Sequence, residues 1–188
     1  MIVYLMIKGE KRMIDYIAFL KGINVSGQKM MKVKDLNNIF IKLGFKNVKT
    51  YVQSGNVRFE SDESNKNDLV GIMEKEIYNV FGYNPTVILK TIKEIEDLVD
   101  ESPFKNIGSE SKAKMYISFL VGYPTKEYEL PLVSREKDVK VVKVSNEIVL
   151  SIVIENNERY YSPNSFIEKE LGVLATTRDW KTISKLID

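Results

Sequence analysis

The sequence of 188 residues contains no cysteine and no histidine, and only five prolines and one tryptophan. Without cysteine, disulfide bonds and thiolate–zinc sites are excluded. Without histidine, the Ser-His-Asp and Cys-His catalytic arrangements are excluded as well. Any bound metal would have to be a hard cation held by oxygen ligands. We expect no cofactor and no metal, and the composition points to no particular catalytic residue.

Positive and negative side chains are nearly equal in number, with 28 basic and 26 acidic residues. The small basic excess lies in residues 1–12, and the rest of the chain carries equal numbers of both signs. A nucleic-acid interface needs a positive footprint, so this balance disfavours a nucleic-acid partner. The sequence also lacks the roughly 18 consecutive apolar residues that span a bilayer. We therefore expect a cytoplasmic protein with no membrane partner.

Residues 1–12 are expected to be a non-native or disordered leader. The apolar run 1–7 is too short for a signal-peptide core, and its charges follow it instead of preceding it. The codons of Lys8-Gly9-Glu10 can spell a bacterial ribosome-binding sequence ahead of a start codon at Met13. We therefore expect Met13 to be the true start of the protein.

Apolar periodicity predicts a first α+β subdomain over residues 13–104. Strands are predicted at 14–20, 48–53, 57–59 and 86–89, and helices at 33–43, 69–81 and 92–101. Ser54-Gly55-Asn56 is a tight-turn sequence, so the second and third strands should form a hairpin. The order β-α-β-β-α-β is the ferredoxin-like arrangement, and the last helix connects it to the second half.

The second subdomain, residues 105–188, is expected to repeat this plan. Tyr16 to Gly22 aligns with Tyr116 to Gly122, with five identities in seven positions. Another hairpin is predicted at 139–153, followed by a helix ending at Leu171 and a short strand at 173–176. The expected fold class is therefore α+β, with two related ferredoxin-like (βαββαβ) subdomains that arose by internal duplication.

Three polar segments are candidates for a ligand site. Loop 21–34 carries four lysines and two glycines ahead of a helix, where free backbone N–H groups suit an anion. The other two are the hairpin turn at 51–56 and the segment 176–180, which joins two threonines, an arginine and the only tryptophan. The candidate ligand-binding residues are Lys21, Asn24, Lys32, Tyr51, Gln53, Ser54, Asn56, Thr176, Thr177, Arg178 and Trp180.

Each polar segment also has an ordinary structural interpretation. The first would be a solvated basic loop and the second a satisfied β-turn. The third would be a capped amphipathic helix, with Thr177 as N-cap and Trp180 in its buried stripe. In that arrangement Arg178 faces outward, free for bidentate recognition of an anion.

Taken in order, Tyr16–Val25, Tyr51–Val57 and Ala175–Thr182 resemble the hallmark motifs of the bacterial family catalogued as domain of unknown function 1697. The resemblance runs from Met13 to about the C-terminus. It implies an α+β protein of two related subdomains, and it implies no activity. Two positions depart from the usual family pattern: lysine at 21 in place of arginine, and aspartate at 179 in place of asparagine.

The function favoured by these observations is binding of a small anionic or phosphate-bearing ligand in a cleft between the two halves. Two alternatives stay open. One is a metal- and cysteine-independent enzyme that uses Lys21 or Asp179 as acid or base. The other is a protein–protein interaction module whose exposed sheet pairs with a partner or, as a homodimer, with itself. A nucleic-acid binder using the sheet aromatics Tyr16 and Phe19 ranks last, because the RNP1 pattern is absent.

Deleting residues 1–12 is expected to change the free energy of unfolding by less than about 1 kcal/mol, because the leader has no counterpart in the repeated pattern. Chemical denaturation of the full chain and of a chain starting at Met13 measures the difference. A larger loss would show that the leader packs against the folded body.

Overall fold

The computed structural model describes residues 12–23, 31–51, 55–105, 113–145, 147–154 and 162–187. The predicted leader falls outside these ranges except for Arg12. The candidate site residues Asn24, Gln53 and Ser54 also lie outside the described residues.

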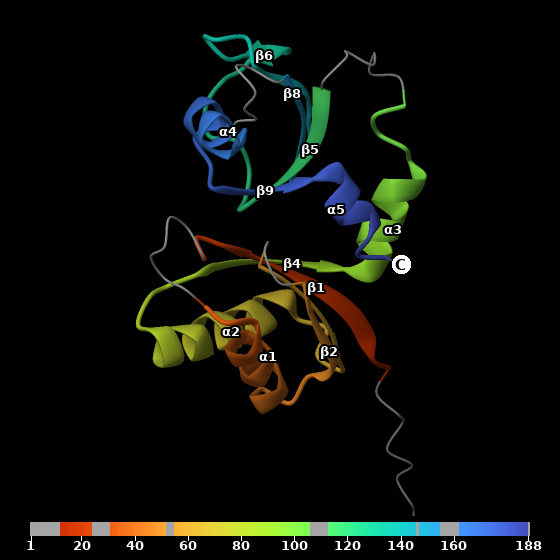
Figure 1. The fold of residues 1–188 in the computed structure, drawn as a ribbon, viewed down its shortest axis with the longest axis vertical. Helices are drawn as coiled ribbons and strands as arrows, with labels where there is room; N and C mark the ends of the chain where they lie inside the picture. Colours follow the sequence, from red (N-terminus) through yellow and green to blue (C-terminus); the bar gives the residue numbers. More distant parts are fainter. Residues whose placement is uncertain are drawn as a thin grey trace, which may run out of the picture.

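The first half is one antiparallel sheet with two helices on its outer face (Figure 1). Its elements are β1 (Ile14–Lys21), α1 (Val33–Lys42), β2 (Lys46–Tyr51), β3 (Asn56–Ser61), α2 (Lys66–Phe81) and β4 (Thr86–Thr91). The strands lie in the order β2-β3-β1-β4, and each neighbouring pair is antiparallel. The predicted succession of strands and helices is therefore observed in this half.

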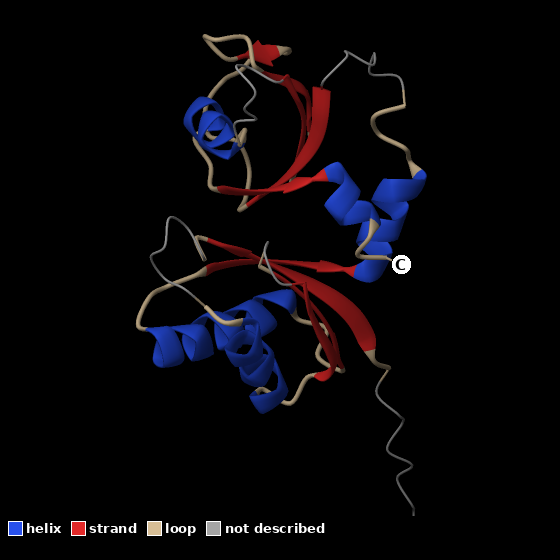
Figure 2. Cartoon of the chain, in the orientation of Figure 1, coloured by secondary structure: helices blue, strands red, loops and turns tan. Residues whose placement is uncertain are grey.

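The second half is a five-stranded antiparallel sheet with one helix on its outer face (Figure 2). Its elements are β5 (Ala113–Leu120), β6 (Leu132–Val133), β7 (Val139–Val144), β8 (Ile148–Ile154), α4 (Asn164–Leu171) and β9 (Ala175–Asp179). The order is β6-β7-β8-β5-β9. Apart from the short β6, the strands take the same relative places as β2-β3-β1-β4.

The second half lacks a helix between its first two long strands, so the predicted βαββαβ order is wrong there. The chain from 121 to 138 is irregular except for β6. Pro124 and Pro131 explain the difference, because proline removes a backbone donor and clashes with the preceding helical turn. Gly122, with φ of 95°, turns the chain at the end of β5.

A short helix follows the last strand of each half without an intervening loop. After β4 comes α3 (Ile92–Asp100), and after β9 comes α5 (Trp180–Ser184). Thr91 and Glu94 form a capping box at the start of α3. Asp179 caps α5 by accepting a hydrogen bond from the Lys181 N–H at 2.8 Å. The predicted N-cap, Thr177, is therefore wrong, because β9 continues three residues beyond the predicted strand end at Thr176.

The two sheets pack face to face, and their helices cover the outer faces. One apolar cluster lies between the first sheet and α1 and α2, and another lies between the second sheet and α4. A third cluster fills the layer between the sheets, with α3 and α5 contributing at its edge. Successive residues of β1 point alternately into the first and third clusters. Burial on both faces explains why this strand is continuously apolar.

Equivalent residues of the two halves meet in the layer between the sheets. Phe19 stacks on Phe119 with ring centroids 4.4 Å apart and an interplanar angle of 20°. These positions are aligned in the two similar heptapeptides, so the halves face each other as they would across a two-fold axis. The contact is dry and apolar at its centre, because Ile17 and Ile117 beside the rings are also fully buried.

Burial of both faces bears on two of the functional alternatives. Tyr16 and Phe19 are buried on opposite faces of β1, so neither ring is available to stack on a base. The inner face of the first sheet is covered by the second sheet instead of being open to a partner. Within the described residues, no helix is both long and apolar enough to cross a membrane.

Replacing Phe19 by alanine is expected to lower the free energy of unfolding by about 3–5 kcal/mol, because it leaves a cavity between the sheets. Tyr123 is an exposed aromatic residue of similar size, and Tyr123→Ala should change stability by no more than about 0.5 kcal/mol. Urea denaturation of both variants tests the expectation. Equal effects would mean that the two sheets do not depend on this contact.

Candidate functional site

Arg178 connects the second and third polar segments with the end of β1. It lies on β9 opposite Ile117, and its side chain enters the layer between the sheets, where it is only 8% exposed. Nε donates a 2.6 Å hydrogen bond to the Asn56 side-chain oxygen, and Nη2 donates a 3.1 Å bond to the Leu20 carbonyl. Both acceptors belong to the first half, so Arg178 joins the two sheets.

The remaining partners of Arg178 are also neutral. Nη1 donates 2.8 Å bonds to the Thr176 hydroxyl and the Thr177 carbonyl. The guanidinium carbon lies 5.6 Å from the centre of the Phe19 ring, a favourable cation–π position. In the described part of the chain no carboxylate pairs with it. Burial lowers the pKa of Arg178 to about 10, which leaves the group charged at neutral pH.

The prediction that Arg178 faces outward is wrong. Because β9 extends to Asp179, strand alternation places Thr176 and Arg178 on the inner face, both buried. Thr177 lies on the other face, where its hydroxyl accepts from Ser118 at 2.7 Å and donates to the Asn164 side chain at 2.9 Å. The structure thus brings Asn56 of the second segment to Arg178 of the third, but as part of an internal hydrogen-bond network.

Lys21 and Lys32, the lysines expected to bind an anion, lie in different surroundings. Lys21 forms a 2.7 Å ion pair with Glu168 of the second half. The same carboxylate accepts a 2.8 Å hydrogen bond from the Ala175 N–H, so the pair fastens the two halves together. Lys32 is exposed at the start of α1 and makes no side-chain cap. With Asp179 engaged as a helix cap, both acid–base candidates of the enzyme alternative have structural partners.

Tyr51 and Trp180 are half-buried parts of the packing between the sheets. The indole of Trp180 meets Phe104 edge-on, with ring centroids 5.2 Å apart. Tyr51 lies beside Arg58, whose pKa is raised above its ordinary value by its hydrogen bonds to Asp15 and also by Tyr51. Arg58 reaches Asp15 at 2.7 Å through Nη2.

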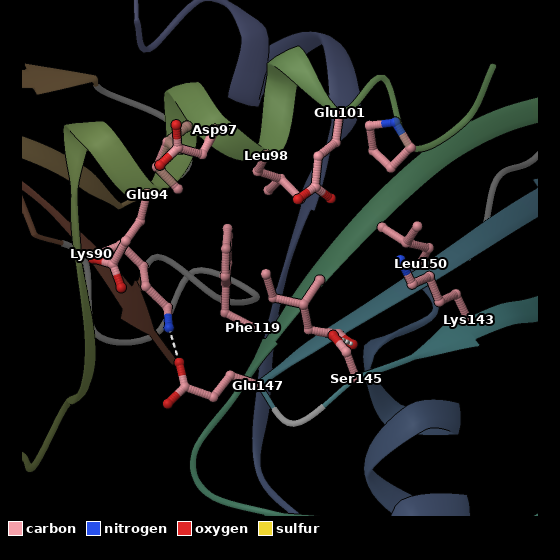
Figure 3. Close-up of a pocket in the computed structure, with 13 residues that line it drawn as sticks. Lys90, Glu94, Asp97, Leu98, Glu101, Phe119, Lys143, Ser145, Glu147 and Leu150 are labelled. Atoms are coloured by element: carbon pink, nitrogen blue, oxygen red, sulfur yellow. Dashed lines mark hydrogen bonds and ion pairs between the residues drawn. The ribbon is translucent and has the colours of Figure 1, made fainter.

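A groove lies between the two halves, where the sequence predicted a ligand-binding cleft, but none of the described candidate site residues lines it. It has a volume of about 460 Å³ and lies between α3 and the second sheet (Figure 3). Its floor is apolar, formed by Phe119, Ile148 and Leu150, and α3 contributes Leu98 and the exposed Glu101. A lysine within the otherwise apolar strand 86–91 was the available signal, because alternation places Lys90 on a buried face.

Lys90 forms an ion pair at one end of the groove. It lies on the inner face of β4 and is only 7% exposed. Its ammonium pairs with Glu147, which lies at the turn between β7 and β8 of the other half (Figure 3). Two carboxylates on the α3 wall have their own cations: Glu94 pairs with Lys66 at 2.6 Å, and Asp97 pairs with Lys93 at 2.7 Å. Hydrogen bonds from Lys66 and Thr91 hold the pKa of Glu94 below its ordinary value despite the opposing effect of burial.

Lys90 and Arg178 take equivalent places in the two sheets. Lys90 lies opposite Ile17 of β1, and Arg178 lies opposite Ile117 of β5. Each is on the last strand of its half, and each side chain reaches the hairpin of the opposite half. The residues around Lys90 can therefore be compared with those at structurally equivalent positions around Arg178.

The space next to Arg178 is filled by large side chains, whereas the equivalent space next to Lys90 is the groove. Arg58 lies opposite Ile17 where Leu150 lies opposite Ile117. Tyr51 is the partner of Asn56 at the end of the first hairpin, and the place of that pair is taken in the second hairpin by Ser145 and Ile148. Replacing tyrosine and arginine by serine and leucine leaves the volume that forms the groove.

Together these features define a class of protein: α+β, with two antiparallel sheets packed face to face and a groove between the halves. The chain belongs to the family described as "Protein of unknown function (DUF1697)", whose model matches residues 13–149. This confirms the resemblance noted in the sequence. The fold is similar to that of the conserved bacterial protein SP0830 from Streptococcus pneumoniae, with 21% identity, a TM-score of 0.63, and coverage of 94% of this chain and 98% of that one. At this identity the likeness shows the fold alone, and no functionally curated protein matches the sequence.

Replacing Arg178 by lysine is expected to lower the free energy of unfolding by about 2–3 kcal/mol. A lysine ammonium cannot reach Asn56, Leu20 and Thr176 together, so buried acceptors lose their donors. The same change at the exposed Arg135 should alter stability by no more than about 0.5 kcal/mol. Chemical denaturation compares the variants, and equal effects would exclude a connecting role for the guanidinium.

Proposed function

We propose that this protein binds a small ligand in the groove beside α3, between its two halves. The observation that carries the proposal is the open volume of about 460 Å³ at a place whose equivalent in the same molecule is filled. Volumes of about 300–1,000 Å³ with an apolar lining and a few polar groups are typical of small-molecule sites. The groove combines an apolar floor with charged groups at its rim.

An open apolar floor is unfavourable unless something covers it. Each Å² of apolar surface left in water forgoes about 25 cal/mol of stabilisation. The Arg178 side shows that this fold can fill the equivalent space with its own side chains. A ligand with an apolar body would cover Phe119 and Leu150 and supply the missing contacts.

The sequence suggested that the ligand would bind at the three polar segments. Among the described residues of those segments, Arg178 bonds to Asn56, and Lys21 pairs with Glu168 of the second half. The groove has no such internal occupant, and it also lies between the halves. We therefore place the proposed binding site there.

We also propose that the two halves, residues 13–104 and 105–188, descend from one duplicated ferredoxin-like unit. Three observations support this: the shared strand order, the contact between the equivalent rings of Phe19 and Phe119, and the short helix after each last strand. The second half then replaced its first helix by the proline-containing segment 121–138.

Filling the groove should abolish ligand binding. Glu101 lines the groove and Asp100 does not, yet both are exposed acidic residues at the end of α3. In a fragment screen by ligand-observed NMR, fragments that bind the wild type should bind Glu101→Trp at least about tenfold more weakly. They should bind Asp100→Trp with unchanged affinity. Equal binding to both variants, or no binding at millimolar concentration, would contradict the proposal.

A further inference from the structure

We propose that the ligand carries an anionic head group, a carboxylate or a phosphate, which replaces Glu147 as the partner of Lys90. This inference rests on the proposed function, because it assigns the ligand's chemistry within the same groove. It depends on three features: the burial of Lys90, the exposure of its partner and the contrast with Arg178.

Lys90 needs a counter-charge in any state of the protein. Its side chain is almost completely buried in the layer between the sheets, and a buried ammonium without a partner is strongly unfavourable. Within the described part of the chain its one ion pair is with Glu147, whose side chain is 55% exposed. The carboxylate can therefore turn into water at little cost, because ion pairs of exposed groups are weak.

The asymmetry between the two partners decides the charge of the ligand. A cationic ligand that took Glu147 would leave Lys90 buried without a counter-charge. An anionic ligand that took Lys90 would release Glu147 into water, where a carboxylate is well solvated. Replacement of Glu147 by an anionic ligand is therefore more favourable than replacement of Lys90 by a cationic one. The anionic head group also gains charge-assisted hydrogen bonds from the Lys90 ammonium.

Arg178 shows what a permanently satisfied cation looks like in the equivalent place. Its acceptors are two backbone carbonyls and the buried side chains of Asn56 and Thr176, none of which can move into water. The position equivalent to Glu147 in the first hairpin is Gly55: their carbonyls accept from Leu120 and Leu20, respectively. Of the two buried cations, only Lys90 has a partner that can be exchanged.

The rest of the groove accommodates such a ligand. In Figure 3, Phe119 lies between Lys90 and Leu150, so an apolar tail can cover the ring while the head group reaches the ammonium. Glu94 and Asp97 on the α3 wall are neutralised by their own lysines. Glu101 lies seven positions beyond Glu94, roughly 10 Å further along the helix, away from the head group.

Four probes that share an eight-carbon chain test the inference: octanoate, octyl phosphate, octanol and octylamine. Affinities are measured by isothermal titration calorimetry on the full-length protein. One or both anions should bind the wild type, and the tighter of the two identifies the head group. Octanol and octylamine should bind at least about tenfold more weakly, because neither can pair with Lys90.

Variants at the ion pair separate exchange from a general charge effect. Glu147→Gln removes the internal competitor and should tighten anion binding about tenfold. Glu127→Gln makes the same charge change at an exposed site outside the groove and should have no effect. Lys90→Met should abolish anion binding. Lys90→Arg keeps the positive charge and should retain anion binding, so it remains informative if Lys90→Met fails to fold.

The outcomes distinguish this inference from the proposed function. Suppose that octanol or octylamine binds as tightly as the anions and that Glu101→Trp blocks this binding. The groove then binds ligands, but the inference of an anionic head group is wrong. If the anions bind and Glu147→Gln does not tighten them, the exchange at Lys90 is overturned. If the anions bind Glu101→Trp as well as the wild type, they do not bind in the groove, and both proposals fail for these ligands.

Discussion

The apolar contact between the two sheets is the constraint on which the rest of the structure depends. Phe19 and Phe119 stack at its centre, so their neighbours Ile17 and Ile117 on the inner faces of β1 and β5 must be apolar. Cations lie away from this centre: Lys90 on β4 and Arg178 on β9 each reach the hairpin of the opposite half, and Arg58 on β3 pairs with Asp15. The layer between the sheets thus joins the halves and also determines where polar chemistry can occur.

Two buried cations in equivalent places meet this constraint in different ways. Arg178 has five N–H donors in a fixed fork and makes four hydrogen bonds, all to neutral acceptors in the protein interior. Lys90 has a single ammonium and depends on one carboxylate at the surface. Arg178 has buried acceptors and lies in space filled by large side chains, whereas Lys90 lies beside an open groove. The same fold therefore contains hydrogen bonds from Arg178 that join the two halves on one side and a proposed binding site beside Lys90 on the other.

Much of the fold could be predicted from the sequence, because apolar periodicity reports which faces are buried. The strand and helix order of the first half, the second hairpin and the family followed from local patterns. The candidate site was harder to predict. Thr176 to Asp179 are polar, so they suggested a helix cap with an outward Arg178, although they form a strand whose alternate residues are buried. The similarity of the two halves predicted a helix between the first two long strands of the second half, but Pro124 and Pro131 oppose a helix there.

The sequence by itself determined the class of fold and the exclusion of thiol and imidazole chemistry. It also determined that Leu20, Asn56 and Arg178 belong to distinctive segments. Only the tertiary structure decided that these residues bond to one another, and that the groove lies beside Lys90. The physical reason is that both outcomes depend on packing between residues far apart in the chain. Whether a space is filled by Tyr51 and Arg58 or left open by Ser145 and Leu150 follows from how the sheets face each other, which no local pattern records.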